Sequence, residues 1–209
     1  MAGKAALRAQ IVLERRALAD DLADIPAEIW DAPSLCTGWT VRDVVAHMTA
    51  TARMTPAAFF PKFAGVGFNF EKLQARGIRD NLGPSPAETL RHFQNVTSNT
   101  SGPPGPPQTL AGEVVVHSED IRRPLGIKHE YPIDLVVELA DFFKKSNLII
   151  GSRNRIAGLS LRATDSDWKH GGGPEMEGPT VSLLLAMTGR KAALDELSGP
   201  GVEVLRNRP

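Results

Sequence analysis

The spacing of apolar residues changes along this chain, and the change limits the folds open to it. In most of the first 145 residues, apolar side chains recur every three or four positions, which is the interval of amphipathic helices. Beyond Gly151, the run Leu159–Ala163 alternates apolar and polar residues, which is the period of a half-buried strand. The sequence therefore predicts a mainly α protein with a small α/β part after the helices.

Sequence signals at helix ends divide the first part into five helices. The first runs to about residue 24, and the second begins at or near Val41, because Thr40 can cap it and Asp43 can complete a capping box. Pro124 and Gly126 are expected to end the fourth helix at about residue 123. The third, fourth and fifth helices are expected from Ser85 to the proline-rich run at 101–107, over about 109–123, and over 132–145.

The remaining segments are predicted with weaker signals. Residues 61–83 carry scattered Gly and Pro and are expected to form a long connection around a short helix at 70–78. Two short strands, a helix at 178–187, a helix at 190–197 and a strand at 202–205 are expected after the first strand. We predict a four-helix bundle over residues 1–130 and a small α/β domain over 131–209.

Composition excludes several classes of partner and site. The 24 basic and 24 acidic residues balance, so the long-range field that attracts nucleic acid or anionic membranes is missing. Cys36 is the single cysteine, which excludes an internal disulfide and an all-thiolate metal site. The first 21 residues mix charged and apolar side chains and resemble neither a secretory signal nor a membrane span. We expect a cytoplasmic protein, monomeric or homodimeric, that binds neither nucleic acid nor membranes.

Glu113 and His117 stand four residues apart, and their meaning depends on the three valines between them. On a helix the two Cβ atoms lie about 5–6 Å apart and the side chains can share a metal ion. On a strand they lie roughly 13 Å apart, which is too far for one ion. Valine favours strands, but the flanking residues are helical in composition and the segment is long. We therefore favour a helix.

A third ligand must come from another helix, and His47, at the edge of the apolar stripe of the second helix, is the natural candidate. Two imidazoles and a carboxylate with an open fourth position are typical of catalytic zinc, although nickel, cobalt or iron would also suit these ligands. The competing interpretation is a hydrogen-bonded core histidine and an ordinary Glu–His surface pair.

Several further residues have two interpretations each. Asp43 can orient His47 or cap its helix, and Asp120 can orient His117 or pair with Arg123. Cys36 is expected to be a small buried residue without a chemical role. The run from His170 to Gly173 is similar to a lipase oxyanion motif, but the chain lacks the matching nucleophile elbow, so we interpret it as a tight hairpin.

The runs SLCTGWTVRDVVAHM at 34–48 and GEVVVHSEDIRRPLGI at 112–127 resemble the paired signature of the mycothiol-dependent maleylpyruvate isomerase family, within the DinB-like superfamily. Residues 164–190 and 197–206 resemble the small C-terminal part of the same family. The resemblance implies that His47, Glu113 and His117 hold one divalent metal ion, with zinc as the expected ion, and that Arg190 binds a substrate carboxylate. For Arg190 the competing role is to satisfy a helix C-terminus.

The resemblance further implies an enzyme that activates mycothiol, as thiol cofactor or cosubstrate, for thiol transfer or cis–trans isomerisation of a small electrophilic substrate. A zinc ion stabilises a thiolate at neutral pH, so the metal can supply a nucleophile that the isolated Cys36 cannot. The alternative is a non-enzymatic metal- or ligand-binding module of the same fold.

Overall fold

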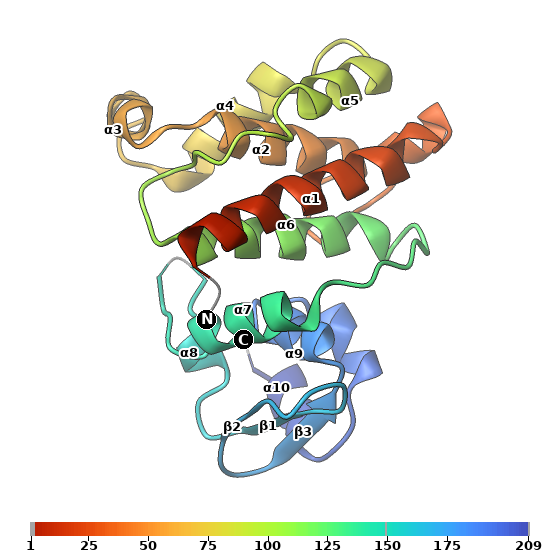
Figure 1. Ribbon diagram of the computed structural model, residues 1–209, viewed down its shortest axis with the longest axis vertical. Helices are drawn as coiled ribbons and strands as arrows, with labels where there is room; N and C mark the ends of the chain where they lie inside the picture. Colours follow the sequence, from red (N-terminus) through yellow and green to blue (C-terminus); the bar gives the residue numbers. More distant parts are fainter. Residues whose placement is uncertain (1–2, 149, 209) are drawn as a thin grey trace. The chain divides into compact units, whose positions relative to one another are not determined.

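The computed structural model describes residues 3–148 and 150–208 of the chain (Figure 1). It divides into two compact units, one formed by residues 3–129 and the other by the described residues from 130 onward. No helix within these ranges is both long enough and apolar enough to cross a lipid bilayer.

The N-terminal unit is a helical bundle. Helix α1 packs along α6, and α2 packs against α4, α5 and α6. The inward faces carry apolar side chains that are almost fully buried, among them Leu18, Val44, Met48 and Phe93. Their burial removes apolar surface from water and holds the helices together. The bundle helices are α1 (Lys4–Ala23), α2 (Val41–Arg53), α5 (Pro86–Gln94) and α6 (Pro107–Arg122).

Local capping fixes where α2 and α5 begin, as predicted. Thr40 accepts a hydrogen bond from the Asp43 amide, and the Asp43 carboxylate accepts one from the Thr40 amide, which completes a capping box. Ser85 caps α5 by accepting from the Glu88 amide at 3.3 Å. These bonds satisfy amide groups that have no partner within the helix.

The short helix predicted at 70–78 is confirmed and is longer than expected, as α4 (Phe70–Asn81). The long connection predicted around it over residues 61–83 is wrong at its start, because α3 (Pro56–Ala64) extends into it. Thr55 and Asn69 cap α3 and α4 with side-chain oxygens, and Pro56 sits in the first turn of α3, where a missing amide costs nothing. The glycines that suggested a loop lie between the helices or, like Gly77, on a face where a side chain would crowd Ala50 of α2.

The three valines before His117 are helical, which confirms the choice on which the metal site depends. Val114, Val115 and Val116 lie in the middle of α6 and are all buried. Packing of α6 against α1 and α2 outweighs the modest intrinsic preference of valine for strands.

The C-terminal unit has a three-stranded sheet in the order β2-β1-β3. Strand β1 (Ser160–Ala163) pairs antiparallel with β2 (Lys169–Gly171) and parallel with β3 (Glu175–Gly178). Helix α7 packs on α9, and α9 also contacts β1 and β3. The helical elements are α7 (Ile133–Phe143), α8 (Ser152–Arg155), α9 (Thr180–Met187), the 3-10 helix η2 (Lys191–Glu196) and α10 (Gly201–Arg206).

Two predictions for this unit are wrong. The expected strand at 202–205 is helix α10, in which Val202 and Leu205 are buried at a spacing of three residues. The run from His170 to Gly173 is not a hairpin, because its flanking strands β2 and β3 lie on opposite sides of β1. It crosses the start of β1 so closely that a Cβ on Gly173, whose φ is +117°, would lie 2.3 Å from the Gly158 carbonyl oxygen. Only glycine fits there without strain.

Candidate metal centre

Helices α2 and α6 bring the two predicted histidine ligands together. The ring centroids of His47 and His117 are 4.9 Å apart, and the ring planes meet edge to face at 77°. Trp39, just before α2, lies beside both, with its ring centroid 5.1 Å from that of His47 and 6.5 Å from that of His117. All three rings are half-buried. The N-terminal unit thus has a pair of adjacent imidazoles partly shielded by an indole.

Glu113 lies one helical turn before His117 on α6, and its side chain is largely buried. Neither carboxylate oxygen has a hydrogen-bond partner in the described part of the chain, and Oε2 is 3.7 Å from Nη2 of Arg15. Burial raises the pKa of Glu113, although the nearby Arg15, His117 and Thr51 offset part of this effect. A buried carboxylate with unused lone pairs is costly, and a cation would relieve that cost.

Asp120 fixes the orientation of His117. Its carboxylate is fully buried, and Oδ2 lies 2.9 Å from Nδ1 of His117. An ionised carboxylate only accepts hydrogen bonds, so Nδ1 carries the proton and Nε2 keeps its lone pair for a metal. Arg123, the alternative partner predicted for Asp120, donates through Nε to Glu119 at 2.7 Å. For Asp43 the capping interpretation holds.

Cys36 lies closer to this centre than the sequence indicated. Its thiol donates to Oδ2 of Asp120 at 3.0 Å and lies 3.7 Å from Nδ1 of His117. The loop that carries it is anchored to α6, since the Leu35 amide donates to the Asp120 carbonyl at 3.0 Å. No spacing rule relates residue 36 to residue 120, so only the folded chain reveals the contact.

Among the described residues, Cys36, His117 and Asp120 form a group whose possible ligand atoms lie within 4.8 Å of one another. Two of the separations, 2.9 and 3.0 Å, are hydrogen-bond lengths. Zinc bonds of about 2.0–2.3 Å at tetrahedral angles hold ligand atoms further apart. We therefore assign this group to the support of His117. The predicted ligands are the His117 Nε2, the His47 ring and the Glu113 carboxylate, and donors of these types suit a divalent ion.

Arg190, the predicted substrate-binding arginine, lies in the C-terminal unit just before η2. Its Nη1 donates to the Thr188 carbonyl at 2.9 Å, at the end of α9, which is the contact of a side chain that satisfies a helix C-terminus. Arg155 is nearby, and burial together with the charge of Arg190 lowers its pKa. A role of Arg190 toward substrate stays a prediction.

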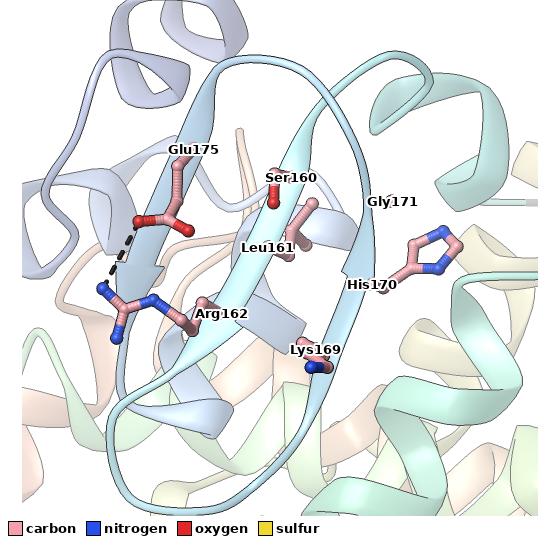
Figure 2. A pocket seen from close by; sticks show the side chains of 7 residues that line it. All are labelled: Ser160, Leu161, Arg162, Lys169, His170, Gly171 and Glu175. Atoms are coloured by element: carbon pink, nitrogen blue, oxygen red, sulfur yellow. Dashed lines mark hydrogen bonds and ion pairs between the residues drawn. The ribbon is translucent and has the colours of Figure 1, made fainter.

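The sheet of the C-terminal unit carries a shallow pocket of about 340 Å³, which none of the predicted site residues lines. In Figure 2 the Arg162 side chain reaches the Glu175 carboxylate, and the His170 ring points away from both. Arg162 thus has an anionic partner of its own. The lining residues are Ser160, Leu161, Arg162, Lys169, His170, Gly171 and Glu175.

The N-terminal unit is thus a helical bundle in which two helices bring two histidines together near a buried carboxylate. Residues 11–99 match the family described as the mycothiol maleylpyruvate isomerase N-terminal domain. Comparison with curated protein sequences gives no match.

Two solved structures extend the likeness beyond the N-terminal unit. One is a crystal structure of the mycothiol-dependent maleylpyruvate isomerase, with a TM-score of 0.68 and 15% sequence identity, covering 96% of this chain and 94% of the other. The second is a histidine-to-alanine mutant of the mycothiol-dependent maleylpyruvate isomerase, with a TM-score of 0.67 and 14% identity over the same shares. At this identity the matches show a shared fold over nearly the whole chain.

Proposed function

We propose that the chain is a metal-dependent enzyme that activates a low-molecular-weight thiol, mycothiol, for cis–trans isomerisation or transfer to a small electrophilic substrate. The observation that supports the proposal is that two helices bring two histidine rings into contact. His47 and His117 stand 4.9 Å apart, and Glu113 offers a buried carboxylate without hydrogen bonds one turn from His117. We propose these three side chains as the ligands of one zinc ion.

The chemistry follows from the donor set. When bound, the ion lowers the pKa of a coordinated thiol and so makes the thiolate available at neutral pH. Asp120 holds the proton of His117 on Nδ1, which keeps Nε2 directed to the site as a lone-pair donor. Trp39 covers one side of both imidazoles and limits the approach of water. Three protein ligands leave a position open for the thiol.

The comparisons support the choice of thiol and of reaction class in this proposal. The matched domain family and the similar crystal structures are both named for mycothiol-dependent maleylpyruvate isomerase. We extend mycothiol to this chain as cosubstrate, and a small electrophile that an added thiolate can isomerise as substrate. Arg190 is proposed as the group that binds a substrate carboxylate.

Metal analysis of the purified protein tests the ligand set. The wild type is expected to hold one zinc per chain, and His47→Ala and His117→Ala none. His92→Ala is the matched control, because His92 lies on α5, where its Nδ1 contacts the Asn81 carbonyl at 3.1 Å, and is not a proposed ligand. Loss of zinc in the control as well, or a wild type without zinc, would reject the site.

An isomerisation assay with and without mycothiol tests the reaction. Activity that requires both zinc and mycothiol is the expected result. A protein that binds zinc in the proposed site but turns over no cis-configured electrophile with mycothiol would instead be a binding module of the same fold.

A further inference from the structure

Arg15 is buried beside Glu113 of the proposed metal centre, and two of its guanidinium nitrogens lack hydrogen-bond partners among the described residues. Its side chain, on α1, is fully shielded from solvent. Nη1 donates to the Asn99 carbonyl at 2.6 Å, whereas Nε and Nη2 have no hydrogen-bond partner among the described residues. A buried charged group normally satisfies its donors, because removing a charge from water is costly. The two unused donors need an explanation.

Next to these two donors lies the Glu113 carboxylate, which also lacks hydrogen bonds. Nη2 of Arg15 is 3.7 Å from Oε2 of Glu113, which is ion-pair range but longer than a hydrogen bond. Both oxygens of Glu113 also lack hydrogen-bond partners within the described chain. Nε and Nη2 form one edge of the planar guanidinium, and such an edge can hold a carboxylate with two parallel bonds. The Nε–Nη2 edge of Arg15 is therefore suited to bind the Glu113 carboxylate beside it.

The rest of the guanidinium is fixed to the helices that carry the proposed ligands. Asn99, which accepts from Nη1, donates through its own Nδ2 to the Ala52 carbonyl in the last turn of α2 at 3.2 Å. Helix α1, which carries Arg15, runs along α6, which carries Glu113 (Figure 1). Arg15 is therefore linked to α2 through Asn99, and its Nη2 lies within ion-pair range of Glu113 on α6.

We propose that Arg15 is a positioning residue of the metal centre, which orients the Glu113 carboxylate through its Nε–Nη2 edge. The inference rests on the proposed function, since it takes Glu113 as a metal ligand. Each carboxylate oxygen accepts one of the two parallel bonds and keeps its other lone pair for the ion, so a flexible side chain presents its ligand atoms in one place. Lysine at this position supplies the charge but not the paired donors.

Zinc affinity measured by competition with a fluorescent chelator tests the proposal. Arg15→Met is expected to bind zinc about ten- to hundredfold more weakly than the wild type, with Arg15→Lys in between. Cobalt(II) gives a second readout that a general loss of stability would not change. The visible bands of the cobalt-loaded Met variant should differ from those of the wild type, because the carboxylate no longer coordinates in the same way.

Arg122→Met is the matched control. Arg122 is also a fully buried arginine that joins α6 to α1, but its Nε donates to Asp21 at 2.7 Å. This variant should lose stability and keep the wild-type zinc affinity. Unchanged or tighter zinc binding by Arg15→Met would overturn the proposal, and so would an equal weakening by Arg122→Met.

If Arg15→Met does not fold, Arg15→Lys decides, because it retains the buried charge. An unchanged affinity together with an unchanged cobalt spectrum in that variant would overturn the proposal. A wild type that binds no zinc would reject both the proposed function and this inference. A wild type that binds zinc, with Arg15 variants of the same zinc affinity, would reject only the inference.

Discussion

Replacing Asp120 by asparagine isolates the charge that holds His117. Oδ2 of Asp120 accepts from His117 Nδ1 at 2.9 Å and from the Cys36 thiol at 3.0 Å, in a fully buried position. Asparagine keeps the shape and an accepting oxygen but loses the charge. Hydrogen bonds to charged groups contribute about 1.5–3 kcal/mol against about 1 kcal/mol for neutral pairs, so the hydrogen bond that orients His117 should weaken by about 0.5–2 kcal/mol. That difference corresponds to about a 2- to 30-fold loss of zinc affinity.

Chelator competition measures the loss, and Asp43→Asn is its control. Asp43 precedes His47 by four residues, but its Oδ2 accepts from the Thr40 amide and hydroxyl at 2.9 and 2.8 Å instead of orienting the ring. This variant should destabilise α2 by about 0.3–1 kcal/mol through loss of a negative charge at the helix start, with zinc affinity unchanged. Wild-type affinity in Asp120→Asn, or an equal loss in Asp43→Asn, would refute the reasoning.

Three further outcomes are expected. Gly173→Ala should lower the free energy of unfolding by at least about 2 kcal/mol, since its Cβ would meet a carbonyl oxygen at 2.3 Å, whereas Gly172→Ala, with open space around it, should be nearly neutral in urea denaturation. Burial alone would raise the pKa of Asp141, but hydrogen bonds from Lys144 and Trp168 outweigh it and lower the pKa. Its contribution to stability is therefore present above about pH 4 and is lost at lower pH, so the stability gap between wild type and Asp141→Asn should narrow as acid is added. Zinc at a hundredfold excess over its dissociation constant should raise the free energy of unfolding by about 2.7 kcal/mol, and a zinc-independent stability would contradict a metal centre.

Helix starts were predictable because their causes are local. The capping box of α2 joins Thr40 and Asp43, and the Ser85 cap reaches three residues to Glu88. Such bonds need no distant partner, so the sequence contains everything that determines them. Most of the helices of the N-terminal bundle were predictable for a similar reason, since each apolar stripe lies along a single helix.

Errors arose where a local pattern had more than one outcome. Four residues at 202–205 suit a strand, but the buried pair Val202 and Leu205 belongs to one face of a helix. The glycines of residues 171–173 suit a hairpin, yet they carry the chain across β1 to the far side of the sheet. In both cases, packing against neighbouring backbone determined the conformation of the segment. A short segment does not encode which backbone will lie beside it.

The metal centre divides in the same way. The sequence by itself determined that Glu113 and His117 share one face of a helix, because a spacing of four is a property of the helix alone. Only the tertiary structure decided that the His47 ring lies against the His117 ring and that the buried Asp120 carboxylate contacts Nδ1 of His117. It also placed Arg15 beside Glu113. These contacts join separate helices, so the packing of α1, α2 and α6 around a common core creates them, and no single segment specifies that packing.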